Sequence, residues 1–268
     1  MNVDKIKLIV CDIDGTILPA GKNSLSSLTV QALNKAKKNG YKVLVCTGRH
    51  YTLIPKSFFI DLDMDVIGTI NGACLVKKDG TIIEKHPMSK EDMEGITNLC
   101  KKYDFGLGFK FEDAIVTYAN HDIFIKGYIK DKSEYSLILN DDATCSHHLK
   151  HGYPLGTFII GDETRIASFS KEMPDLVFAW SVRDGFDVFL KRINKVTAIE
   201  RVLKDNGWTM ENVIAFGDAG NDTCMIQQAS IGVAMGNAKD NVKEYADIVA
   251  DTCENDGVAK VLKELQMI

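Results

Sequence analysis

Two carboxylates near the start of the chain give the clearest chemical signal in the sequence. Asp12 and Asp14 stand in the tract Cys-Asp-Ile-Asp-Gly-Thr, residues 11–16, directly after the largely apolar run of residues 6–11. Such a run is typical of a buried parallel strand, in which residues two apart point the same way. Both carboxylates are therefore expected to face one site at the carboxyl end of a strand, where open α/β sheets bind ligands.

Such a pair of carboxylates is suited to phosphoryl transfer. One carboxylate can attack phosphorus to form an aspartyl-phosphate, and the second can exchange protons with the leaving group and with water. Two like charges this close also need a counter-charge, which Mg2+ would supply as a cation that prefers oxygen ligands. The alternative interpretation is a plain acidic turn after a strand, since Asp and Gly are common turn residues.

Two further tracts could hold a phosphate. Thr47, Gly48 and Arg49 follow a strand expected at residues 41–46, and a hydroxyl, free N–H groups and a guanidinium can bind phosphate oxygens. Lys195 opens a helix expected over residues 194–206, where a lysine opposes the helix dipole unless an anion lies nearby. The alternatives are a solvent-facing loop for the first tract and a solvated basic run for the second.

The tract Gly-Asp-Ala-Gly-Asn-Asp, residues 217–222, follows another expected strand. Asp218 is placed to ligate the cation shared with Asp12 and Asp14. Asp222 lies four residues on, on the same helix face, and could complete the shell of the ion directly or through water. A plain acidic helix start is the alternative.

Composition limits the function classes. The chain has 268 residues, 45% of them hydrophobic, and a net charge of −5, which argues against general nucleic-acid binding. No apolar stretch approaches the ~18 residues of a membrane span, and no signal peptide is evident. The seven cysteines form no C-x-x-C pair and do not suggest a disulfide framework. We expect a cytoplasmic protein without membrane or nucleic-acid partners, as a monomer or a weak homo-oligomer.

Strand and helix signals alternate at both ends of the chain, which predicts an α/β fold with a parallel, Rossmann-like sheet. The middle of the chain has a different pattern, with short strands and a polar stretch rich in Asp and His. We therefore predict a core domain from residues 1–85 and 186–268, with an inserted α+β domain at residues 86–185.

The four tracts, in this order, resemble the motifs of the haloacid dehalogenase superfamily. The tract Asn-Gly-Ala at residues 71–73 and the insert are similar to its Cof-like branch, subfamily IIB, with a C2B cap. The resemblance implies an Mg2+-dependent phosphatase in which Asp12 is the nucleophile and Asp14 the general acid/base. It also implies roles for the remaining motif residues: phosphate or substrate binding by Thr47, Gly48, Arg49, Asn71, Lys195 and Asn221, and metal binding by Asp12, the backbone carbonyl of Asp14, Asp218 and Asp222.

We predict an enzyme that hydrolyses phosphate monoesters of small metabolites, sugar phosphates foremost. A phosphomutase or phosphotransferase that uses the same aspartyl-phosphate is an alternative, as is a phosphosugar-binding regulator without turnover. The sequence does not name the substrate. In the insert, His147, His148 and His151 could touch substrate, but a solvated polar loop is the favoured interpretation, and a three-histidine metal site is disfavoured.

Overall fold

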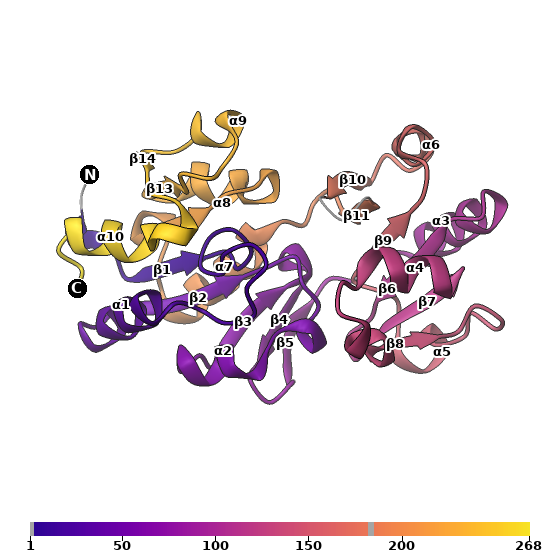
Figure 1. Cartoon of the computed structure of the whole chain (residues 1–268), viewed down its shortest axis with the longest axis horizontal. Coiled ribbons are helices and arrows are strands. Elements are labelled where there is room, and N and C mark those ends of the chain that lie inside the picture. The colour runs from indigo at the N-terminus through magenta and orange to yellow at the C-terminus, as the bar shows by residue number, and fades with distance from the viewer. Residues whose placement is uncertain (1–2, 182–184) are drawn as a thin grey trace. The chain divides into compact units, whose positions relative to one another are not determined.

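The computed structural model describes residues 3–181 and 185–268. The chain divides into a core unit, Met1–Ile83 with Asn194–Ile268, and an insert unit, Glu84–Ile193 (Figure 1). The second boundary lies later than the predicted one at 185/186. The reason is that strand β11 (Gly185–Leu190) pairs with strands β9 and β10 of the insert unit and not with the core sheet.

The core unit is built on an eight-stranded sheet in the order β14-β13-β12-β1-β2-β3-β4-β5. Neighbouring strands from β14 to β3 run parallel, and β4 pairs antiparallel with β3. This arrangement confirms the predicted α/β class with a parallel sheet. The strands are β1 (Leu8–Cys11), β2 (Lys42–Cys46), β3 (Val66–Thr69), β4 (Cys74–Lys77), β5 (Ile82–Lys85), β12 (Val213–Gly217), β13 (Ile231–Ala234) and β14 (Ile248–Val249).

Helices α7 and α8 pack against each other and against this sheet, while α1 packs against α10 and β2. Strand β1 is buried along its whole length, as expected for a strand covered on both faces. The helices of the core unit are α1 (Ser27–Lys38), α2 (Lys56–Asp61), α7 (Lys195–Asn206), α8 (Thr223–Gln228), α9 (Asp240–Lys243) and α10 (Gly257–Glu264).

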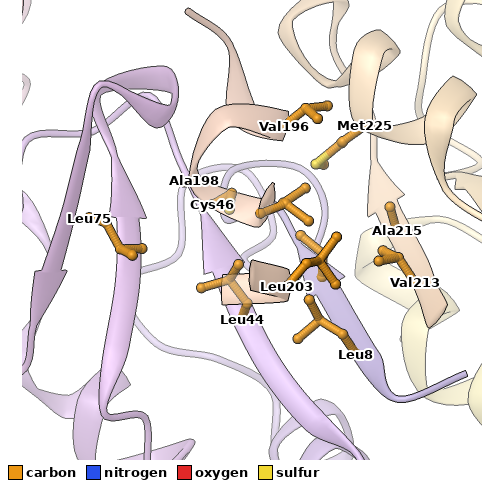
Figure 2. Packing of buried hydrophobic residues seen from close by; sticks show 12 residues of the cluster. Leu8, Leu44, Cys46, Leu75, Val196, Ala198, Leu203, Val213, Ala215 and Met225 are labelled. Atoms are coloured by element: carbon orange, nitrogen blue, oxygen red, sulfur yellow. The ribbon is translucent and has the colours of Figure 1, made fainter. Parts of the chain in front are cut away.

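Helix α7 is positioned by both its cap and its apolar face. The Asn194 side chain accepts a hydrogen bond from the Val196 N–H, and Thr197 completes a capping box. Leu203 packs near Leu8 of β1 and Leu44 of β2 (Figure 2). Ile199, one turn before it, belongs to the same buried cluster. Burying each such side chain contributes about 1.5–3 kcal/mol, so this face fixes where the first residue of the helix, Lys195, must lie.

The insert unit contains a second sheet in the order β10-β11-β9-β6-β7-β8, antiparallel except between β7 and β8. Its elements are α3 (Lys90–Lys102), β6 (Gly106–Lys110), β7 (Ile115–Ala119), α4 (His121–Tyr128), β8 (Ile138–Asn140), α5 (His148–His151), β9 (Gly156–Ile160), α6 (Glu163–Ser168), β10 (Leu176–Ser181) and β11. The expected α+β character is present. In the part of the chain that the structure describes, no helix combines the length and the apolar character that crossing a membrane requires.

Candidate active site

The carboxyl ends of β1 and β12 bring two of the predicted tracts together. The strands pair in parallel with Cys11 opposite Phe216, and the Asp12 N–H continues the ladder to the Phe216 carbonyl at 3.0 Å. Leu8 and Val10 face helix α7 in the packed core. By strand alternation, Asp12 continues this face toward the start of α7.

Lys195 lies at that start and is fully buried, with 0% of its side chain exposed. Its Nζ contacts Asp12 Oδ1 and lies 2.6 Å from Asp222 Oδ1. Burial opposes the charge of Lys195, but the two carboxylates more than offset this and raise its pKa above the ordinary value. Lys195 thus lies buried between two carboxylates that favour its ammonium form, and the solvated basic run is excluded for this residue.

Asp222 is held by both of its carboxylate oxygens. Oδ2 accepts hydrogen bonds of 2.9 Å from the N–H groups of Asp218 and Ala219, while Oδ1 faces Lys195. Gly217 allows this close approach, since a Cβ there would lie 2.4 Å from the Asp222 Cβ. Asp222 thus connects the lysine to the loop that carries Asp218.

Asp218 lies against the loop that follows Asp14. Its Oδ1 accepts a 2.9 Å hydrogen bond from the Thr16 hydroxyl. Gly15 has φ +83°, and a Cβ there would approach Asp218 Oδ2 to 2.2 Å, so the turn requires glycine for two reasons. Thr16 was not among the predicted site residues, although it belongs to the same D-x-D-G-T tract.

Asp12, Asp218 and Asp222 each offer an oxygen atom, and these atoms lie within 4.8 Å of one another. Burial and the neighbouring Asp222 raise the pKa of Asp218 to about 7. Burial also raises the pKa of Asp12, although Lys195 opposes this. Three carboxylates around one ammonium leave excess negative charge in a buried place, and an oxygen-only donor set of this kind fits a hard divalent cation.

Asp14 does not point its carboxylate at this cluster in the conformation described. Arg49 binds it with a bidentate fork, Nε to Oδ2 at 2.9 Å and Nη2 to Oδ1 at 2.7 Å. The same guanidinium donates to the Leu53 carbonyl at 3.1 Å. The structure thus joins two predicted site residues that are far apart in sequence. It gives the Asp14 carboxylate a cationic partner other than a metal and leaves its backbone carbonyl as the predicted ligand atom.

The tracts around Thr47 and Asn71 meet through the backbone. The Asn71 N–H donates to the Thr47 carbonyl at 3.0 Å, and the Thr47 hydroxyl accepts from the Arg49 N–H at 3.1 Å across Gly48. Asn71 is buried with φ 54°, and its Oδ1 accepts from Asn221 Nδ2 at 2.9 Å. All ten predicted site residues therefore belong to the core unit, and most of them are connected to another by a hydrogen bond.

Comparison with known proteins identifies the family. The haloacid dehalogenase-like hydrolase profile matches residues 9–262. The chain belongs to this family. It is 29% identical over 259 residues to 5-amino-6-(5-phospho-D-ribitylamino)uracil phosphatase YcsE of Bacillus subtilis, covering 96% of this chain and 95% of that protein. It is also 29% identical to pyridoxal phosphate phosphatase YbhA of Escherichia coli, covering 96% and 97%.

Solved structures agree with this assignment. The HAD subclass IIB sugar phosphatase BT4131 superimposes with a TM-score of 0.85 at 26% identity, covering 98% of this chain and all of that one. The phosphatase BT1666 of Bacteroides thetaiotaomicron gives a TM-score of 0.83 at 26% identity, covering 98% and 96%. The family and fold predicted from the motifs are confirmed, and so is the enzyme class, a phosphatase of the haloacid dehalogenase superfamily.

Proposed function

We propose that this haloacid dehalogenase-like phosphatase removes phosphate from small phosphorylated metabolites, sugar phosphates among them, through an aspartyl-phosphate on Asp12. The observation that carries the proposal is the position of Asp12. Its carboxylate is buried at the end of β1 in contact with Lys195, and Asp14 stands two residues on. The substrates in the names of the similar phosphatases, a ribitylaminouracil phosphate, pyridoxal phosphate and sugar phosphates, support the substrate class.

In the first half-reaction an Asp12 carboxylate oxygen attacks phosphorus, and the ester P–O bond breaks. Asp14, protonated at that stage, gives its proton to the leaving alkoxide. Lys195 balances the charge of Asp12 and of the phosphoryl oxygens as that charge redistributes. In the second half-reaction Asp14 takes a proton from water as the water oxygen attacks phosphorus, which releases inorganic phosphate and restores Asp12.

Asp12, Asp218, the backbone carbonyl of Asp14 and, directly or through water, Asp222 would hold Mg2+. When bound, this ion supplies positive charge that neutralises the transferring phosphoryl group. The carboxylates near Lys195 support this assignment, because their oxygen atoms converge within 4.8 Å. The insert unit is the predicted cap that selects among substrates, and this role stays a prediction.

The proposal is tested by phosphate release from an aryl phosphate and from a panel of phosphorylated metabolites, with and without EDTA. We expect hydrolysis of the aryl ester and of several metabolites, abolished by EDTA and restored by Mg2+. Binding of sugar phosphates without release of phosphate would contradict the hydrolase proposal. Transfer of the phosphoryl group to an added sugar, in preference to water, would replace it with a phosphotransferase.

Replacing Asp218 by asparagine should raise the Mg2+ concentration needed for half-maximal activity at least about tenfold, since the site loses an anionic oxygen ligand. The measurement is activity titrated with Mg2+. Asp205, which pairs with Arg201 on the exposed side of α7, provides the control variant Asp205→Asn. An unchanged Mg2+ titration for Asp218→Asn would place the metal elsewhere.

The raised pKa of Asp218 gives a pH prediction for the metal-free protein. Its folded value of about 7 exceeds the usual value for an unfolded chain, about 3.9, so the folded state binds this proton more tightly. The contribution of Asp218 to stability is therefore present at low pH and is lost as pH rises through about 7. At higher pH the buried Asp218 is charged, which costs stability, and bound Mg2+ would offset this cost. Mg2+ should therefore raise Tm more at about pH 8 than at about pH 6. An equal or larger shift at the lower pH would contradict this.

Arg49 must release Asp14 before Asp14 can donate a proton, and phosphate is a natural second partner for its fork. Replacing Arg49 by alanine should raise KM for an aryl phosphate about tenfold or more, because the variant loses one charge-assisted hydrogen bond to the phosphate. The KM of Arg49→Lys should lie between those of the wild type and Arg49→Ala, because lysine keeps the charge but not the bidentate geometry. Arg201→Ala is the control. An unchanged KM in Arg49→Ala would show that this residue does not bind substrate.

A further inference from the structure

A second group of ligating side chains lies in the insert unit, away from the chemistry assigned above. Asp113 is in the turn between β6 and β7, while His147 and His151 belong to the loop and short helix α5 before β9. Their ligand atoms all lie within 4.8 Å of one another. The sequence places Asp113 more than thirty residues before the histidines, so the fold alone brings the three together.

One carboxylate faces two imidazoles in this cluster. His147 Nε2 lies 3.1 Å from Asp113 Oδ1, and His151 Nδ1 lies 3.1 Å from Asp113 Oδ2. The two imidazole rings are nearly parallel, 8° apart, with centroids at 4.1 Å. Two ligand atoms about 2.1 Å from a tetrahedral zinc ion lie about 3.4 Å from each other. The ligand atoms of the three residues lie within 4.8 Å of one another, so small side-chain shifts would let them share one ion.

The neighbouring structure holds the histidines in this arrangement. The His151 N–H donates to the His147 carbonyl at 3.2 Å, so the two side chains lie one helical turn apart on the same face. The His147 N–H donates to Asp141 Oδ2 at 2.9 Å, and its ring packs on Phe111 with centroids 4.7 Å apart. Only 13% of the His147 side chain is exposed, so this ligand is ordered by packing as well as by hydrogen bonds.

His148 is not part of the cluster, although it is adjacent in sequence. Its Nδ1 is 3.0 Å from the Tyr118 hydroxyl, and its ring stacks on Tyr153. The disfavoured three-histidine site is thus absent from the described structure, and a carboxylate takes the place of the third imidazole. The favoured interpretation, a solvated polar loop, does not hold for His147, whose side chain is only 13% exposed.

We propose that Asp113, His147 and His151 form a binding site for a borderline divalent transition metal, of which Zn2+ is the representative. Two histidines at i and i+4 with one carboxylate are a nitrogen-rich donor set, which suits such ions better than Mg2+ or Ca2+. Three protein ligands leave further coordination positions for water. Binding would connect the β6–β7 turn to the loop before β9, and it is independent of the proposed phosphatase chemistry.

The test is titration of the untagged full chain with ZnCl2 by calorimetry, in saturating Mg2+ so that the core carboxylates are occupied. We expect one Zn2+ site per chain, and at least tenfold weaker binding in Asp113→Asn, His147→Asn and His151→Asn. His86→Asn is the matched control, because His86 forms a similar 3.0 Å pair with Glu84 but has no second imidazole in that pair. Circular dichroism establishes that each variant is folded.

A second measurement needs no variant. The electron paramagnetic resonance spectrum of bound Cu2+ should show coupling to imidazole nitrogen, which the all-carboxylate core site would not give. Absence of Zn2+ binding in saturating Mg2+, absence of nitrogen coupling, or wild-type affinity in a folded His147→Asn variant would overturn the proposal. The three residues would then form only an ion-paired cluster.

Discussion

Replacing Asp12 by asparagine is expected to reduce kcat/KM for any phosphate ester by at least about 10³-fold, the scale of losing a covalent nucleophile. The amide is nearly isosteric with the carboxylate but has no anionic oxygen to attack phosphorus. Asp12 is buried in contact with Lys195, which balances the charge of the attacking carboxylate. The measurement is steady-state hydrolysis of an aryl phosphate, whose good leaving group makes the nucleophile decisive.

The fold should survive this change, because Lys195 keeps its 2.6 Å contact with Asp222. Thermal unfolding of Asp12→Asn establishes this independently of activity. Asp14→Asn is an informative comparison, since an aryl phosphate needs little proton donation in the first step. Activity of the folded Asp12→Asn protein above a few per cent of wild type would argue against covalent catalysis at this residue.

Replacing Lys195 by methionine is expected to damage both stability and catalysis. The change leaves Asp12 and Asp222 buried without their shared cation, and breaking a buried charge pair in this way costs about 3–5 kcal/mol. Loss of a buried charge that stabilises the phosphoryl oxygens should also lower kcat by about 10²-fold or more. Chemical denaturation gives the first quantity, and kinetics at a temperature where the variant is folded give the second.

Lys204→Met is the matched control, because Lys204 is exposed on the same helix. It should alter neither quantity measurably. Excess Mg2+ should restore part of the stability of Lys195→Met, since a divalent cation would replace some of the lost positive charge near the carboxylates. A Lys195→Met protein as stable as wild type would show that the buried pairing contributes little to folding.

The sequence predicts which tracts meet at the carboxyl ends of β1 and β12 because strand geometry is local. The apolar run before Asp12 is enough to place that carboxylate at the sheet edge. The two-residue spacing predicts that Asp14 faces the same site, but its carboxylate lies against Arg49 instead. The helix dipole only suggests an anion near Lys195 and leaves a solvated basic run open, so the role of this lysine comes from the resemblance to the family motifs. The bidentate Arg49–Asp14 pair is not predictable in this way, since it depends on how two separate loops fold over the sheet.

Local sequence patterns also do not predict which of the two sheets a strand will join. Strand β11 has the apolar character of a core strand, but it pairs with β9 and β10, and this moves the unit boundary. Helix α4 is missed because residues 121–128 include two β-branched isoleucines and a glycine, and Asn120 before it makes no side-chain cap. The His121 N–H instead donates to Asp142, which is distant in sequence. The Asp113–His147–His151 cluster is missed for a related reason, because a turn distant in sequence supplies the carboxylate.

Trapping the phosphorylated enzyme would show directly whether Asp12 is the nucleophile. Asp14→Asn should form the aspartyl-phosphate from an aryl phosphate but hydrolyse it slowly, since the residue that takes a proton from water is lost. Rapid acid quench, followed by borohydride reduction and peptide mass spectrometry, should convert Asp12 to homoserine in the peptide of residues 8–22. Stoichiometric release of the aryl alcohol with no modified residue, or with modification at an aspartate other than Asp12, would contradict the account.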